Sequence, residues 1–441
     1  MVTKLDMSAI ISSIACNNIE TIEECKLYGN IDINATARVI SKRQIRFLQN
    51  PLNALFLKRA ETSEISINSI FTTGSLPGEK LAVFENGEPA LTIKDGVFYF
   101  NFDPFYSIRY YLNEEKGSIQ NKSIFPHLIK FYWRIPKLLR PQIRKMVRRK
   151  RRSNIKPPED FLGVYVNILS KILENCFIEN GFEIKEEKRL FAVTHDIDTC
   201  KCYNDGISYI REIEKSLNIP TTVFIVPFGQ EYDPDLNLLA DLSGEDFEIG
   251  LHGFSHDGHL LREGPIIFEK KIKKALNFLK NGGIEIFGYR NPYLMRSEFL
   301  LESLSKLRFQ YDSSSPDIDT LPLTRPYIGL HYNKPITRTI AIKNNITRRI
   351  LQIPSSYPQD VQILDDYNLN DKEAFNYFKV KIDFIKDFDG LFIFHTHPIY
   401  LINREGFFKG VIEYAKSKNF LPLLMKEIAS KYQNQSHDNK L

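Results

Sequence analysis

The second half of the chain, from about residue 187, alternates short apolar runs with longer amphipathic segments. This alternation is typical of parallel strands joined by crossover helices. Apolar positions at three- and four-residue spacing predict helices over 209–217, 268–279 and 298–307. The runs predicted as strands are 190–193, 222–226, 247–251, 284–289, 307–311, 351–353 and 391–394. The expected fold class is α/β, a distorted (β/α) barrel of the TIM type with about seven strands.

Residues 1–128 carry a different pattern, in which short apolar runs are separated by turn dipeptides. Asn86-Gly87 and Asp95-Gly96 lie between such runs and predict hairpins. We expect an accessory β-rich or α+β domain here, as an N-terminal α+β extension of a barrel domain that covers residues 187–432. Residues 433–441 are polar and are expected to form a disordered tail.

Residues 129–186 are predicted to form a basic linker followed by a helix. Eight of the 13 residues from 140 to 152 are lysine or arginine. One interpretation of 140–152 is a solvated helix or linker between domains. The other is a basic amphipathic stretch that contacts an anionic membrane surface or an anionic polymer. Residues 160–181 show helical apolar spacing.

Composition and charge indicate how many domains the chain forms and which kinds of partner it has. The 441 residues exceed one ordinary core, and 59 basic against 54 acidic residues give no global charge that favours nucleic acid. The five cysteines are scattered, and Cys200 and Cys202 are interpreted as structural thiols. No apolar run reaches the roughly 18 residues that span a bilayer, and the N-terminus is a poor secretory signal. A cytoplasmic protein is expected, peripheral at the inner membrane face if the basic stretch binds there.

Polar residues gather where four of the predicted strands end. In a (β/α) barrel the carboxyl ends of the strands form one face, and active sites are built there. We therefore expect these polar stretches to converge in space although they lie far apart along the chain. They are Thr194–Asp198, His252–His256, Arg290–Tyr293 and His395–Pro398.

Two imidazoles and two carboxylates have the spacing of a metal site. His252 and His256 are four residues apart, which lets both rings face one point. Asp196 and Asp198 are two apart at the end of an extended strand and project to one side. A Zn²⁺ ion takes imidazole nitrogen and carboxylate oxygen, although another divalent transition metal would also suit this set. One carboxylate can complete the ligand shell while the other remains available as a base.

Such a site predicts hydrolysis of a carbonyl compound. Water on the ion has a pKa of about 7 and is a nucleophile at neutral pH. The ion and a backbone N–H stabilise the charge that develops on the carbonyl oxygen. The leaving amine then needs a proton, for which His395 and His397 are the candidates. Arg290 can hold the second aspartate through a paired hydrogen bond.

The ordered motifs resemble those of the polysaccharide deacetylases of carbohydrate esterase family four, over about residues 187–425. The first motif has two aspartates separated by one residue, so the resemblance is to the D-x-D branch of that family. The fourth lacks the tryptophan common in the family. The matching stretches are Thr194-His-Asp-Ile-Asp198, Gly250-Leu-His-Gly-Phe-Ser-His-Asp-Gly258, Gly288-Tyr-Arg-Asn-Pro-Tyr293, Tyr311-Asp-Ser-Ser314 and Thr396-His-Pro-Ile-Tyr400.

The resemblance implies which aspartate does what. Asp196 takes the place of the catalytic base, and Asp198 takes the metal-ligand position. His252 and His256 resemble the two histidine ligands of the metal. The third motif implies that Arg290 orients the base.

The resemblance also implies how the substrate is handled. Tyr293 lends its backbone N–H to the oxyanion, and His397 is placed as the acid, with His395 as the competing candidate. Residues 351–360 resemble a segment of the D-x-D branch, in which Asp360 supports the site. A bland role of Asp360 in a turn or cap is the alternative.

The predicted function is a metal-dependent hydrolase that removes N-acetyl groups from a sugar of a polysaccharide or glycan precursor. In this hypothesis metal-bound water attacks the acetamide carbonyl, with an aspartate as base and a histidine as acid. The expected partner is an N-acetylated saccharide and no nucleic acid. The alternatives are a metal-dependent amidase acting on a small non-sugar amide and a non-catalytic glycan-binding barrel.

Overall fold

The computed structural model describes part of the chain, and the chain divides into two compact units. One unit holds residues 1–115, 164–187 and 435–441, and the other holds 116–163 and 188–434. The predicted basic stretch 140–152 and the predicted helix 160–181 lie outside the described residues. Those described are 45–47, 76–84, 89–94, 97–100, 189–229, 231–297, 299–317, 335–342, 346–387 and 390–435.

The first unit contains a four-stranded antiparallel sheet in the order β1-β2-β3-β4. The short strands expected around Asn86-Gly87 and Asp95-Gly96 are present, and Lys94 of β3 pairs with Val97 of β4. The four strands are β1 (Ile45–Phe47), β2 (Glu79–Phe84), β3 (Pro89–Lys94) and β4 (Val97–Phe100).

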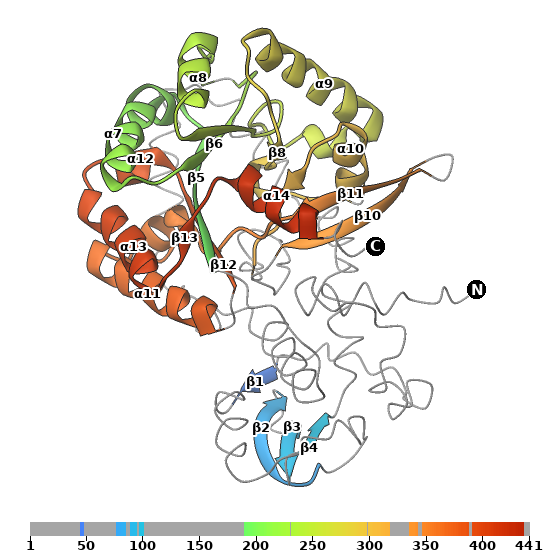
Figure 1. Cartoon of the computed structure of the whole chain (residues 1–441), viewed down its shortest axis with the longest axis vertical. Coiled ribbons are helices and arrows are strands. Elements are labelled where there is room, and N and C mark those ends of the chain that lie inside the picture. The colour runs from blue at the N-terminus through green and yellow to red at the C-terminus, as the bar shows by residue number, and fades with distance from the viewer. Residues whose placement is uncertain are drawn as a thin grey trace. The chain divides into compact units, whose positions relative to one another are not determined.

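The second unit is built on seven neighbouring parallel strands that curl into a half-barrel (Figure 1). Their order is β11-β9-β8-β7-β6-β5-β12, which confirms the predicted distorted (β/α) barrel. An antiparallel strand, β10 (Ile336–Ile342), extends the edge beyond β11, and β13 (Leu421–Pro422) pairs with β5. The seven are β5 (Leu190–Ile197), β6 (Thr221–Ile225), β7 (Phe247–Leu251), β8 (Gly288–Tyr289), β9 (Tyr311–Asp312), β11 (Ile346–Gln352) and β12 (Leu391–Thr396).

Strands β8 and β9 have two residues each and are shorter than the predicted runs 284–289 and 307–311. Ile284 donates its N–H to Leu279 at the end of a helix, so the run 284–289 reaches the sheet only at Gly288. Gly288 lies opposite Tyr311, and a Cβ at this position would be 1.8 Å from the Tyr311 ring. Only glycine therefore lets β8 and β9 pair this closely.

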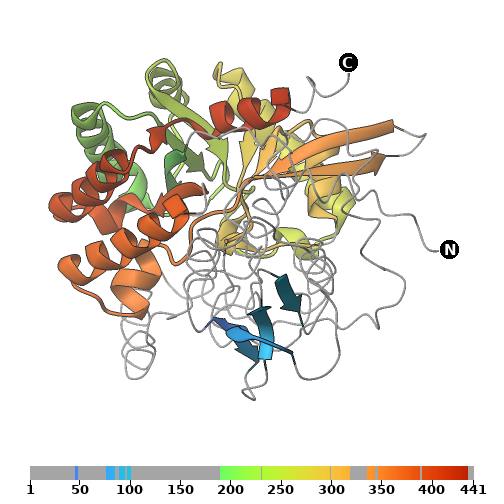
Figure 2. The same ribbon diagram turned by 60° about the horizontal axis from the view of Figure 1, so that its bottom comes forward.

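Helices α7 to α13 lie around the outer side of the curved sheet (Figures 1 and 2), whereas Met425 and Ile428 of α14 pack in the core cluster that contains Ala192. Short helical turns occur at Cys202–Gly206, Leu260–Arg262, Pro292–Leu294 and Gln362–Asp366. No helix among the described residues is long and apolar enough to cross a membrane. The helices are α7 (Ile207–Leu217), α8 (Leu236–Ser243), α9 (Pro265–Asn281), α10 (Leu300–Lys306), α11 (Asp371–Asp387), α12 (Pro398–Leu401), α13 (Glu405–Ser417) and α14 (Met425–Gln435).

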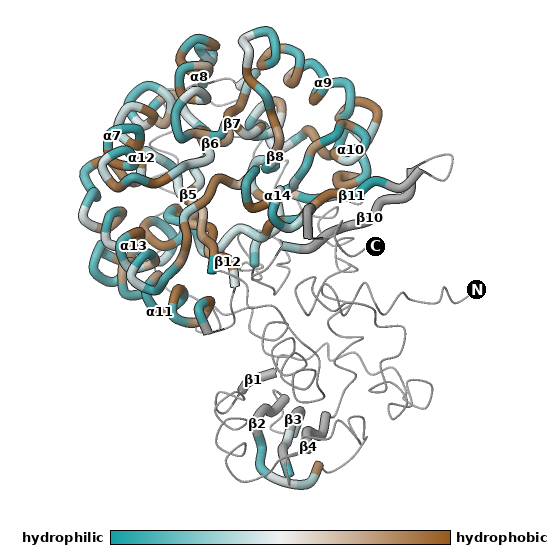
Figure 3. The backbone as a smooth tube through the Cα atoms, in the orientation of Figure 1, coloured by the Kyte–Doolittle hydropathy of each residue, from teal (hydrophilic) through white to brown (hydrophobic). Residues whose placement is uncertain are grey.

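Helix α9 shows why these segments are helical. Phe268, Ile272, Ala275 and Leu279 recur at four- and three-residue spacing and are all buried. Pro265 begins the helix, where its missing N–H costs nothing. Apolar residues are likewise interspersed with polar ones along the other helices (Figure 3). One face of α9 therefore packs on the sheet while the other meets water.

The strands are buried on both faces, which explains their continuous apolar runs. In β5, Phe191 and Val193 belong to the core cluster on the helix side, while Leu190 and Ala192 belong to the cluster inside the half-barrel. Helix α14 continues to Gln435, into the segment 433–441 predicted as a tail.

A buried ion pair joins helix α11 to the segment after β9, and both of its partners also bind the backbone of the segment after β11. The Lys381 Nζ lies 2.7 Å from Asp317 Oδ2 and donates to the Tyr357 carbonyl oxygen at 2.6 Å. Burial lowers the pKa of Lys381, and the neighbouring Asp317 raises it. Removing one partner of such a pair leaves an uncompensated buried charge.

We expect Lys381→Met to lower the free energy of unfolding by about 3–5 kcal/mol because Asp317 loses its counter-ion. Urea unfolding followed by far-UV circular dichroism measures the change. Lys372→Met, at an exposed position of the same helix, is the control and should stay within about 0.5 kcal/mol of the wild type. Equal effects of the two substitutions would contradict a stabilising role of the pair.

Candidate metal and acid–base site

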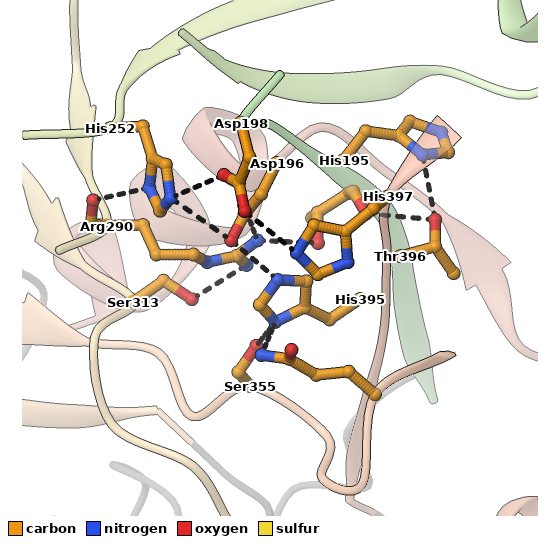
Figure 4. Close-up of polar contacts among 12 residues, drawn as sticks. His195, Asp196, Asp198, His252, Arg290, Ser313, Ser355, His395, Thr396 and His397 are labelled. Carbon is orange, nitrogen blue, oxygen red and sulfur yellow. Dashed lines mark hydrogen bonds and ion pairs between the residues drawn. The ribbon is translucent and has the colours of Figure 1, made fainter. Parts of the chain in front are cut away.

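The alternation of side chains along β5 and β12 brings the candidate residues to one side. These strands pair in parallel, with His395 opposite Thr194 and Thr396 opposite His195. Asp196 shares the interior side with Ala192, and His395 shares it with Ile393. His195 faces the helices instead, where its Nε2 lies 2.6 Å from Glu214 Oε1 of α7. Figure 4 shows the interior residues pointing toward one another.

Asp198, His252 and His256 form a group with the dimensions of a metal site. The Nε2 atoms of both histidines lie 3.2 Å from Asp198 Oδ1, and the three possible ligand atoms are within 4.8 Å of one another. Around a tetrahedral ion with bonds of about 2.0–2.2 Å, ligand atoms are separated by about 3.3–3.6 Å. Burial raises the pKa of Asp198, but His256, His252 and His397 together lower it well below its usual value. An ionised carboxylate and two imidazoles therefore fit a divalent transition-metal ion.

The protein also sets the orientation of these ligands. His252 Nδ1 donates to the Arg290 carbonyl oxygen at 2.9 Å, which leaves the Nε2 lone pair directed at Asp198. The His256 ring packs against Tyr293 with ring centroids 4.3 Å apart, and the Tyr293 hydroxyl donates to the His256 carbonyl oxygen. Both imidazoles are thus held with a ring nitrogen available to an ion.

Asp196 lies beside this group and is held at both oxygens. Arg290 Nη1 donates to Oδ1 at 2.9 Å, and His395 Nε2 lies 2.7 Å from Oδ2. Burial raises the pKa of Asp196, but His252, His395 and Arg290 together hold it well below its usual value. The carboxylate is therefore ionised although it is buried.

Arg290 is itself fully buried and is fixed from several sides. Its Nη1 also donates to Thr194 Oγ1 at 3.0 Å, and Nη2 donates to Ser313 Oγ at 3.1 Å. The guanidinium lies over the Phe224 ring, 4.2 Å from its centroid. This packing keeps the charge of Arg290 directed at Asp196.

His395, near the end of β12, and His397, just after this strand, differ in their surroundings. His397 Nδ1 lies 2.8 Å from Asp360 Oδ1, and the His397 backbone N–H donates to Asp360 Oδ2 at 2.5 Å. Burial lowers the pKa of His397, but Asp360 and Asp198 raise it well above its usual value. Burial and the positive charge of Arg290 lower the pKa of His395 to about 3, against the opposite effect of Asp196. His397 is thus the better proton donor at neutral pH.

The structure brings almost all of the predicted site residues together. Asp196, Asp198, His252, His256, Arg290, His395, His397 and Asp360 are joined by the contacts above. Tyr293 lies next to His256, with φ of 61° in the turn Pro292–Leu294. The role of its N–H toward an oxyanion stays a prediction.

Sequence reasoning missed Ser355 and Gln359, which both contact His395 Nδ1. Both lie in the run 351–360 that the resemblance singled out, but only Asp360 was named from it. The signal available in the sequence was the group of polar residues that follows the apolar run 351–353. Ser313, which contacts Arg290, was quoted within the fourth motif without a role.

No protein-family model and no curated protein sequence matches this chain. A provisionally named polysaccharide deacetylase of Mycobacterium smegmatis is 17% identical, with a TM-score of 0.45, over 57% of this chain and 93% of that one. The chitin deacetylase of Colletotrichum lindemuthianum is 11% identical, with a TM-score of 0.37, over 55% and 88%. A pseudoenzyme of carbohydrate esterase family four from Bacillus anthracis is 10% identical, with a TM-score of 0.34, over 56% and 66%. Similarity at this level assigns no activity.

We expect His252→Ala and His256→Ala to weaken zinc binding by more than the roughly 10–100-fold that follows loss of an outer contact. Each substitution removes one of three ligand atoms. Zinc titration by calorimetry measures the affinity. His259→Ala, in the same loop but outside the ligand group, is the matched control. Wild-type zinc affinity in both ligand variants would place the ion elsewhere.

Proposed function

We propose that this protein is a metal-dependent hydrolase that removes N-acetyl groups from a saccharide. One observation carries the proposal. The Asp198/His252/His256 group lies between an ionised carboxylate, Asp196, and a histidine backed by a second carboxylate, His397. A ligand group flanked by a base and an acid suits hydrolysis of an amide. The order of the sequence motifs, which resembles that of the polysaccharide deacetylases, favours an acetamido sugar as the substrate.

The residues of the chain divide the work. Asp198, His252 and His256 would hold the ion, which when bound lowers the pKa of water and polarises the acetyl carbonyl. Asp196 accepts the proton of the attacking water, and Arg290 keeps this carboxylate in place. His397 gives a proton from Nε2 to the leaving amine while Asp360 holds its Nδ1–H. The products are acetate and the free amino sugar.

We expect the wild-type protein loaded with zinc to release acetate from N-acetylglucosamine oligomers. Asp196→Asn should lower the rate about 10²–10⁴-fold, because an amide cannot accept the proton, while zinc remains bound. Acetate release and metal content are measured on the same samples. Asp257→Asn, the same change in the loop after His256, is the control and should keep its activity.

Each other result has a definite meaning. A wild-type rate in Asp196→Asn would show that the base is another group. Cleavage of small non-sugar amides without acetate release from the oligomers would favour an amidase. Saccharide binding without any cleavage by the metal-loaded protein would favour a glycan-binding barrel.

The acid is identified by comparing His397→Ala with His395→Ala. Without His397 the amine leaves unprotonated, so acetate release from the amide substrate should fall about 10²–10⁴-fold. Hydrolysis of 4-nitrophenyl acetate, whose leaving group needs no proton, should be affected far less by this substitution. His395→Ala should lower both reactions alike, since it disturbs Asp196. The opposite pattern would make His395 the acid.

A further inference from the structure

Gln359 and Asp360 are neighbours in the chain and contact two different histidines, His395 near the end of β12 and His397 just after it. Asp360 accepts from His397 Nδ1, whereas the Gln359 side-chain nitrogen lies 2.9 Å from His395 Nδ1. We propose that Gln359, assisted by Ser355, is a positioning residue that holds His395 as a neutral imidazole whose Nε2–H is donated to Asp196. The inference rests on the proposed function, in which Asp196 is the base.

The direction of this hydrogen-bond chain begins at Arg290. A guanidinium only donates, so the Asp196 oxygen that faces Arg290 accepts. An ionised carboxylate has no proton to give, so its second oxygen also accepts. The contact of 2.7 Å between Asp196 Oδ2 and His395 Nε2 therefore requires the hydrogen on Nε2.

A neutral imidazole with hydrogen on Nε2 has a bare Nδ1, which needs a donor. Two donors are in place: the Gln359 amide nitrogen at 2.9 Å and the Ser355 hydroxyl at 2.8 Å. His395 is 1% exposed, Gln359 3% and Ser355 0%. Since solvent hardly reaches these atoms, the two side chains must supply the donor themselves.

The amide decides the direction because the hydroxyl can donate or accept. With its NH₂ group toward Nδ1, Gln359 excludes a hydrogen on that atom and hence a charged His395. Asp360, one residue further on, does the opposite and requires a hydrogen on His397 Nδ1. One loop thus gives opposite roles to two histidines that are two residues apart in the chain. His395 stays a fixed donor to the base, and His397 can carry the second proton that an acid needs.

The loop is held firmly enough to make this distinction. Lys381 binds the Tyr357 carbonyl oxygen, and the Tyr357 N–H donates to Asp317 Oδ1 at 2.8 Å. The Gln359 N–H donates to Gln362 Oε1 at 3.2 Å. These contacts fix the backbone at Tyr357 and at Gln359, so the Gln359 side chain is kept next to His395.

The test reads the hydrogen positions on the imidazole directly. The 441-residue chain with ¹⁵N-labelled histidine rings is studied by two-bond ¹H–¹⁵N correlation spectra. The His395 signals are assigned by their loss in His395→Gln. We expect the pattern of a neutral ring with hydrogen on Nε2. A hydrogen on Nδ1 in the wild-type protein would overturn the proposal.

Gln359→Glu replaces the donor by an acceptor and should place a hydrogen on His395 Nδ1. The kcat for acetate release should then fall about 10–100-fold with little change in KM, as for loss of an outer contact. Gln362→Glu is the matched control, since Gln362 is also buried and a glutamate keeps the side-chain oxygen that accepts from the Gln359 N–H, and it should leave the His395 signals unchanged. Ser355→Ala should keep the wild-type pattern because the amide remains.

The two proposals fail separately. If the wild-type protein released no acetate, the proposed function would be wrong while the spectrum still reported the state of His395. If Gln359→Glu left the His395 pattern unchanged, Gln359 would not set the hydrogen position, whatever the activity. If Gln359→Glu did not fold, the wild-type spectrum together with that of Ser355→Ala would still decide the point.

Discussion

The site depends on the parallel pairing of β5 with β12. These strands lie at opposite ends of the barrel sequence, yet Thr194 is opposite His395 and His195 is opposite Thr396. Because side chains alternate along each strand, this register places Asp196 and His395 on the interior side and sends His195 to the helices. A shift by one residue in either strand would exchange the two sets. The chemistry of the site is thus fixed by backbone hydrogen bonds.

Buried charge is the second feature of the site. Asp196 and Arg290 are both removed from water, and a lone charge in either position would be costly. The pair is accepted because each partner has further contacts: Arg290 with Thr194 and Ser313, and Asp196 with His395. The result is a carboxylate that is ionised, immobile and next to the candidate metal ligands. That is the state a base requires before the reaction starts.

The loop after β11 adds what the strands cannot provide. Strand alternation brings His395 and His397 to the same side but makes them chemically alike. The loop distinguishes them by placing an amide beside one and a carboxylate beside the other. Lys381 and Asp317 hold this loop from outside the site through the backbone of Tyr357. The loop after β11 therefore contributes both to the stability of the fold and to the hydrogen positions on His395 and His397.

The sequence by itself determined the seven strands and the face on which the polar clusters meet. Strands buried on both sides must be apolar along their length, and parallel strands must end on one face, so both features can be read without coordinates. The spacing of His252 and His256 also indicated a metal site with one of two aspartates, and the resemblance of the motifs selected Asp198 as the ligand. Only the tertiary structure decided that His195 bonds Glu214 of α7, that β10 extends the sheet, and that Gln359 faces His395. These depend on which side chains meet across long loops, and a hydrogen bond leaves no periodic pattern in the chain.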